Sequence, residues 1–174
     1  MPTYDGLIPY DEETGAVLTI DTLHHEVHEG EMFHAAHTAS VANGANLDFQ
    51  LTTGAKDVHS AWEVFAGGQV TVSLFEAPTT SGGTAVAAYN MHRDSPNTPQ
   101  SAVVHTPTVS DTGSVALVNG RILPGGTSPT TRVGGGIRAG TEWILKPNTK
   151  YLLRVNNSSG GTIAINAVLE WYEE

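Results

Sequence analysis

The chain has 174 residues, which suits one domain with a hydrophobic core and is short for two. Its formal net charge of -10 at pH 7 argues against nucleic-acid or anionic-membrane partners, because both attract cationic surfaces. The sequence has no cysteine, which excludes a disulfide framework, a thiol nucleophile and a thiolate zinc site. We find no secretory signal and no apolar stretch of membrane-spanning length.

Residues 1–22 are predicted to form an N-terminal arm, because Pro, Gly, Tyr and acidic residues mix there without periodicity. The run Ala16-Val17-Leu18-Thr19-Ile20 can add one strand to a sheet, in its own chain or in a neighbour. No Lys or Arg precedes Lys56, so this part of the chain is strongly acidic. An acidic arm can dock on a basic partner or can be a solvated segment that aids solubility. The candidate contact residues in it are Asp11, Glu12 and Glu13.

Strand signals recur along the rest of the chain, with turn residues between them. One run places Val58, Trp62 and Val64 on the same side, and residues 70–74 alternate cleanly between apolar and polar. Because Gly67-Gly68 separates the two runs, we predict that they pair as a hairpin. No segment shows a sustained helical period, and the best candidate for a helix is the short stretch 54–63.

The C-terminal part gives the strongest strand signal. Residues 151–155 form an apolar run, and the turn-forming residues 156–161 follow it. On the next strand, one face carries Ile163, Ile165, Ala167, Leu169 and Trp171. A stripe of this length should lie in the middle of a sheet, because an exposed apolar edge invites aggregation. We interpret Glu170, Glu173 and Glu174 as a solvated chain end.

Eight to ten short strands at this spacing predict an all-β fold, a β-sandwich over residues 23–174. A Gly-rich segment, residues 119–140, is predicted to be a long loop within it. The loop is locally basic and can contact a partner, such as the acidic arm of a neighbouring copy, or can be a mobile insertion. The candidate contact residues in it are Arg121, Arg132 and Arg138.

Five histidines between residues 24 and 37 raise the question of a metal site. On a strand, His24, Glu26 and His28 would share one face, which is part of a cupin-type ligand set. The cupin glycine and proline pattern is missing, so a solvated sheet face or a subunit contact is the alternative. No catalytic motif is present, and we expect neither enzymatic activity nor a cofactor. Aromatic residues that could stack on sugars are Trp62, Tyr89, Trp143 and Trp171, although core packing is the expected role of most of them.

Five segments, taken in order, resemble small structural proteins of tailed bacteriophages, among them the head decoration, or cement, proteins. The segments are residues 24–30 (HHEVHEG), 81–86 (SGGTAV), 90–95 (NMHRDS), 144–152 (ILKPNTKYL) and 169–173 (LEWYE). The Asn-x-x-Arg-Asp-Ser pattern of residues 90–95 is the most diagnostic of them. The resemblance spans residues 22–173 and leaves the acidic arm outside.

The resemblance implies a jelly-roll sandwich, made in the host cytoplasm, that binds the outer surface of a phage capsid as a homotrimer. Its partner would be the major capsid protein, and its role would be to brace capsomers after expansion. The family offers no catalytic residues to carry over. Two alternatives remain open at this point: a fibre-associated or receptor-binding module that recognises carbohydrate, and a cupin-like metal-binding protein.

Overall fold

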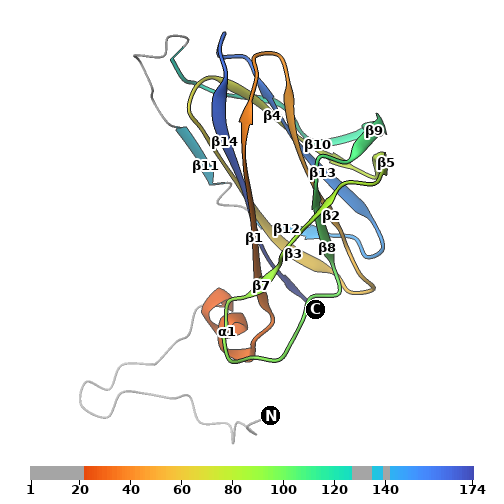
Figure 1. Cartoon of the computed structure of the whole chain (residues 1–174). Coiled ribbons are helices and arrows are strands. Elements are labelled where there is room, and N and C mark those ends of the chain that lie inside the picture. The colour runs from red at the N-terminus through yellow and green to blue at the C-terminus, as the bar shows by residue number, and fades with distance from the viewer. Residues whose placement is uncertain (1–21, 127–134, 139–141) are drawn as a thin grey trace, which may run out of the picture.

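The computed structural model describes residues 22–126, 135–138 and 142–174 (Figure 1). Within these ranges the chain forms one helix, α1 (Thr22–Glu29), and fourteen strands that pair antiparallel throughout. Two six-stranded sheets face each other as the layers of a sandwich, and a two-stranded sheet lies outside them. The prediction of an all-β sandwich is therefore confirmed.

The first sheet has the order β11-β3-β14-β1-β7, and β12 also pairs with β3. Its strands are β1 (Met32–Val41), β3 (Val58–Ala66), β7 (Tyr89–Asn90), β11 (Gly135–Arg138), β12 (Trp143–Leu145) and β14 (Ile163–Glu173). The second sheet has the order β10-β4-β13-β2-β8-β6. Its strands are β2 (Asn46–Thr52), β4 (Val70–Glu76), β6 (Thr84–Val86), β8 (Ala102–His105), β10 (Val115–Leu123) and β13 (Lys150–Asn157).

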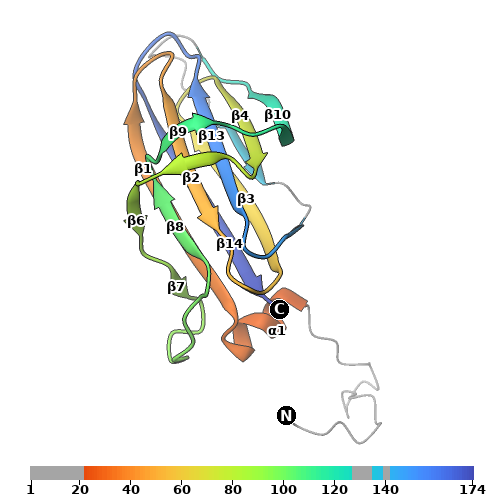
Figure 2. The same ribbon diagram turned by 90° about the vertical axis from the view of Figure 1, so that its right-hand side faces the viewer.

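The small third sheet pairs β5 (Thr79–Ser81) with β9 (Thr108–Asp111) and crosses the outer face of the second sheet (Figure 2). Its cover explains why Leu152 is fully buried although it points away from the sandwich core, between the core residues Tyr151 and Leu153. Two polar contacts fasten it: Lys150 Nζ donates to the Thr80 carbonyl at 2.8 Å, and Thr80 Oγ1 donates to Gln50 Oε1 at 2.6 Å.

The core lies between the two large sheets, and β14 runs through the middle of its sheet between β3 and β1. The predicted stripe is confirmed: Ile165, Ala167, Leu169 and Trp171 are fully buried, and Ile163 is half-buried. Strands such as β3 and β4 turn every second side chain inward, and both sheets contribute to one apolar layer.

The predicted hairpin is wrong. β3 and β4 belong to different sheets, and the turn at Gly67-Gly68 carries the chain from one sheet to the other. Val64 and Val72 both face the core, but from opposite sides. Alternation of apolar and polar residues identifies the buried face of a strand and leaves its pairing partner open.

The helix prediction is also wrong in its position. Residues 58–63 belong to β3, whereas the only helix among the described residues is α1, in the histidine-rich segment. Two helical turns with Leu23 and Val27 as their apolar residues are too short to show a helical period against the surrounding sequence. Among the described residues, no helix is long and apolar enough to cross a membrane.

The Gly-rich segment contains strand as well as loop. Residues 119–123 complete β10, where Gly120 has a positive φ of 65° at a shift in the β10–β4 register. Its backbone N–H donates to Ser73 Oγ at 3.0 Å, so the bulge is held in place. Residues 135–138 form β11 and pair with β3, while residues 127–134 and 139–141 lie outside the described residues.

Candidate functional site

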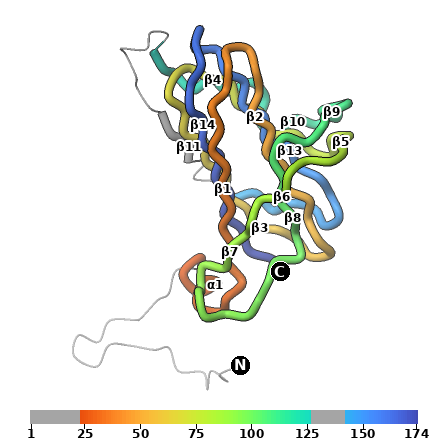
Figure 3. Tube along the Cα trace, in the orientation of Figure 1, coloured from red at the N-terminus to blue at the C-terminus, as the bar shows by residue number. Residues whose placement is uncertain are grey.

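The helix α1, the C-terminus and the connection from β7 to β8 lie together at one end of the sandwich (Figures 1 and 2). Figure 3 traces this connection as it passes α1 and continues into β8. We call this region the helix end and define it by residues 22–31, 89–101 and 171–174. It brings together two of the segments that carry the phage resemblance, 24–30 and 90–95.

Gly30 follows the last residue of α1, at a position that requires glycine. Its φ is +74°, and its N–H donates to the Val27 carbonyl at 3.1 Å, which closes the last turn. A Cβ at this position would lie 2.3 Å from Ser95 Oγ. Glycine therefore supplies the backbone angle and also the room for Ser95 of the opposing segment.

Three further contacts tie the two segments together. Gly30 O accepts hydrogen bonds from Asn90 Nδ2 at 2.7 Å and from Asn97 Nδ2 at 3.3 Å. The carbonyl of His28 lies 3.1 Å from Nδ1 of His92, which donates to it. These bonds satisfy carbonyl groups that a helix C-terminus leaves without partners inside the helix. The two segments, sixty residues apart in sequence, thus form one structural unit.

Glu173 anchors the same connection from the core side. Its side chain is only 5% exposed, and its oxygens accept from Gln100 N at 2.8 Å, Ser101 N at 3.0 Å and Trp171 Nε1 at 3.1 Å. Its carbonyl accepts from Lys56 Nζ at 3.0 Å. The interpretation of Glu173 as part of a solvated chain end is therefore wrong. The sequence held a signal for the burial of Glu173. It lies two residues after Trp171 in β14, so the alternation of the strand places both side chains on the buried face.

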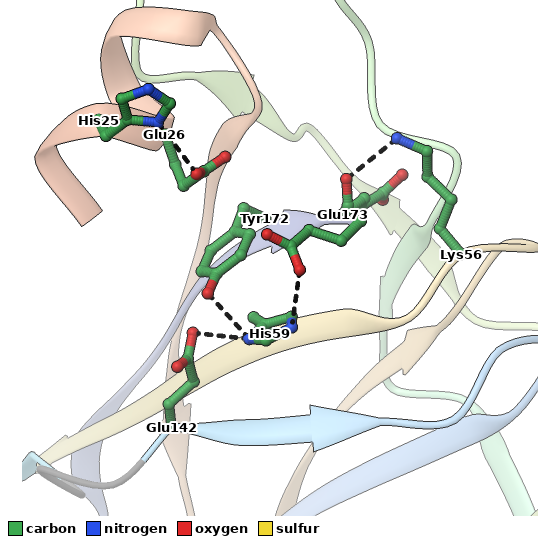
Figure 4. Close-up of polar contacts among 8 residues, drawn as sticks. His25, Glu26, Lys56, His59, Glu142, Tyr172 and Glu173 are labelled. Carbon is green, nitrogen blue, oxygen red and sulfur yellow. Dashed lines mark hydrogen bonds and ion pairs between the residues drawn. The ribbon is translucent and has the colours of Figure 1, made fainter. Parts of the chain in front are cut away.

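A cluster around His59 lies next to this anchor (Figure 4). Nδ1 of His59 is 2.8 Å from the Tyr172 hydroxyl and 3.2 Å from Glu142 Oε1, while Nε2 is 3.5 Å from Glu174 Oε2. The His59 and Tyr172 rings stack with centroids 4.4 Å apart. Burial, together with Glu142 and the other carboxylates nearby, raises the pKa of Tyr172, so its phenol stays protonated near neutral pH. The cluster binds the C-terminus to β3 and to the start of β12.

The predicted metal residues lie on a helix rather than on a strand, and this changes which of them meet. His24 and His28 are one turn apart, with their Nε2 atoms 3.0 Å from each other. Glu26 points elsewhere, toward Tyr172, and contacts His25 Nδ1 at 3.3 Å (Figure 4). The expected three-residue face is thus wrong in geometry. Within the described ranges, no three His, Cys, Asp or Glu side chains are grouped to hold a metal ion.

The predicted assembly contacts are not brought together by the described residues. Arg121 lies in β10 opposite Val72 and lines a small apolar recess between the sheets with Trp62 and Trp143. Arg138 lies in β11 opposite Glu63 in the strand register. The remaining candidates lie outside the described residues: Asp11, Glu12, Glu13 and Arg132.

Two of the three tryptophans are unavailable for stacking on a sugar, since Trp62 and Trp171 are buried in the core. Trp143 is half-buried against the recess. Tyr89 is 56% exposed, and the Arg93 guanidinium lies over its ring at 5.6 Å from the centroid. These four aromatic side chains, all within the described residues, therefore do not form the flat, open platform that a carbohydrate site uses.

A stacked histidine pair closes the side of the sandwich between β1 and β8. The rings of His37 and His105 are 3.8 Å apart and almost parallel, at 9°. Both residues stand at inward-facing positions of their strands, two residues after Ala35 and Val103. Burial lowers the pKa of His37, and the nearby His105 lowers it further.

Because the pKa of His37 is lowered, we expect the folded protein to lose stability in mild acid. Because the folded pKa of His37 is lowered, the unfolded chain binds protons more readily, and the stabilisation present above about pH 6.5 is lost as the pH falls below it. We expect the Tm to fall between about pH 7.5 and about pH 5.5, before most carboxylates titrate. His37→Leu should reduce this pH dependence, measured by circular dichroism. An unchanged pH dependence in His37→Leu would contradict the prediction.

Comparisons with known proteins give no relative from which to transfer a function. No family model, curated protein or solved structure matches this chain. The fold and site define the chain as an all-β sandwich with a polar, helix-capped end, and the functional argument continues from its own residues.

Proposed function

We propose that this protein is a structural protein of a phage virion that binds the outer surface of the capsid as a homotrimer. It contacts the major capsid protein and stabilises the contacts between capsomers. The observation that carries the proposal is the packing of residues 24–30 against residues 90–95 at the helix end. Two segments that separately resemble phage decoration proteins are parts of one unit, as expected if the resemblance reflects a shared structure.

The surface chemistry supports a binding role. Two large apolar side chains of the first sheet are exposed, Phe65 of β3 at 45% and Ile144 of β12 at 65%. Contacts with a partner could bury these two side chains. A protein that binds many equivalent positions on a shell gains overall affinity from small contacts of this sort.

The test is a binding experiment with capsids assembled from the major capsid protein of the same phage. We expect the purified chain to have the mass of three chains by light scattering, and to co-sediment with expanded capsids at saturable stoichiometry. Unexpanded procapsids are the matched control and should bind less. A monomer that fails to bind expanded capsids would overturn the proposal, and specific binding on a glycan array would favour the carbohydrate-binding alternative.

Deletion of residues 1–20 tests the role of the acidic arm. Every described strand begins at Met32 or later, so we expect the truncated protein to keep its circular dichroism spectrum and its Tm. If the arm contacts the capsid or a neighbouring copy, co-sedimentation should weaken and its salt dependence should decrease. Equal binding by the truncated and full-length proteins would leave the arm as a solvated segment.

A further inference from the structure

We propose that α1 binds a divalent transition-metal cation through the Nε2 atoms of His24 and His28. Both side chains are exposed, four residues apart on the helix, so they stand on the same side one turn from each other. Their Nε2 atoms are 3.0 Å apart. This inference goes beyond the proposed function, and its test does not depend on capsid binding.

The orientation of the two rings suits a shared ion. The ring centroids are 4.6 Å apart, farther than the two Nε2 atoms, so the rings converge toward those nitrogens. An ion at the usual metal–nitrogen distance of about 2.0–2.1 Å from both atoms would have an N–metal–N angle of roughly 90°. Such an angle is typical of tetragonal or octahedral coordination, and imidazole nitrogen suits Cu²⁺ and Ni²⁺ in these geometries.

The two Nε2 atoms already lie close together without an ion. With the Nε2 atoms at hydrogen-bonding distance, one ring carries a proton on Nε2 and donates it to the other. On metal binding, both rings would carry their proton on Nδ1 and offer both Nε2 lone pairs to the ion. Water would complete the coordination.

The surroundings hold the pair in place and favour a cation. The C-terminal end of α1 is fixed by the bonds from His92 to the His28 carbonyl and from Asn90 to Gly30. Carboxylates at Glu26 and Glu29 lie on the same helix and make the local potential negative. The third histidine of the helix, His25, is not part of the pair. Its Nδ1 lies 3.3 Å from Glu26 Oε1 and its Nε2 lies 3.9 Å from Glu29 Oε1.

Isothermal titration of the full chain with NiCl₂ near neutral pH tests the proposal. We expect one saturable site per chain, and binding weakened about tenfold or more in His24→Gln and in His28→Gln, since even outer partners of a metal site contribute that much. His25→Gln is the matched control on the same helix and should bind as the parent does. Ni²⁺ should also raise the Tm of the parent protein and of His25→Gln, because a ligand that binds the folded state stabilises it.

Two results would overturn the proposal. One is the absence of saturable Ni²⁺ binding by the parent protein. The other is equal binding by the parent and by the His24→Gln/His28→Gln double variant, which would place the ion on other histidines. Circular dichroism of each variant checks that the fold is retained, and the single variants provide independent tests if the double variant is destabilised.

Discussion

Replacing Trp171 with alanine is expected to lower the free energy of unfolding by about 3–5 kcal/mol, the usual range for removing a fully buried tryptophan. Trp171 is 0% exposed in the central strand β14 and packs against Phe33, with ring centroids 5.7 Å apart. Its indole N–H also donates to Glu173 Oε1 at 3.1 Å. The substitution therefore opens a cavity in the core and removes one donor from the Glu173 anchor. Urea denaturation followed by circular dichroism measures the effect.

Trp143→Ala is the matched control, because Trp143 is only half-buried at the side of the sandwich. We expect a clearly smaller loss there, and an intermediate loss for Trp171→Phe, which keeps most of the apolar volume. Similar m-values would show that the comparison concerns stability rather than the unfolded state. Equal losses for Trp171→Ala and Trp143→Ala would contradict the central place given to β14.

Replacing Glu173 with alanine is expected to lower the free energy of unfolding by about 3 kcal/mol. The substitution leaves three donors without their acceptor, namely Gln100 N, Ser101 N and Trp171 Nε1. Each buried donor left without a partner costs about 1–3 kcal/mol, and water entering the vacated space offsets part of the sum. The β7–β8 connection should also lose protection from hydrogen exchange, because Glu173 holds its end at residues 100–101.

Glu170→Ala provides the control for this effect on the same strand. Glu170 is half-exposed and lies 3.7 Å from His34, so its removal should change stability by about 0.5 kcal/mol or less. Glu173→Gln should fall between the two alanine variants, because the amide keeps one acceptor oxygen and turns a donor toward other donors. Equal losses of unfolding free energy in Glu173→Ala and Glu170→Ala would contradict the stabilising role given to the Glu173 hydrogen bonds.

The candidate site depends on contacts that sequence spacing does not reveal. Gly30 meets Ser95 and Asn90 only because the strand order places β7 beside β1. The histidine-rich segment could be read as a strand as well as a helix, since eight residues contain too few periods to decide. Glu173 is different, because its parity with Trp171 places it on the buried face and it could have been predicted.

Alternation of apolar and polar residues was enough to predict the all-β class and the buried face of strands such as β4 and β14, because a period of two is a local property of an extended chain. The clearest example is the stripe from Ile163 to Trp171, which the core of the sandwich confirms. By contrast, contacts between distant segments place β3 and β4 in opposite sheets and hold the helix on which His24 and His28 converge. Pairing partners and side-chain constellations arise from contacts between distant segments, and the alternation within one strand carries no information about its neighbour.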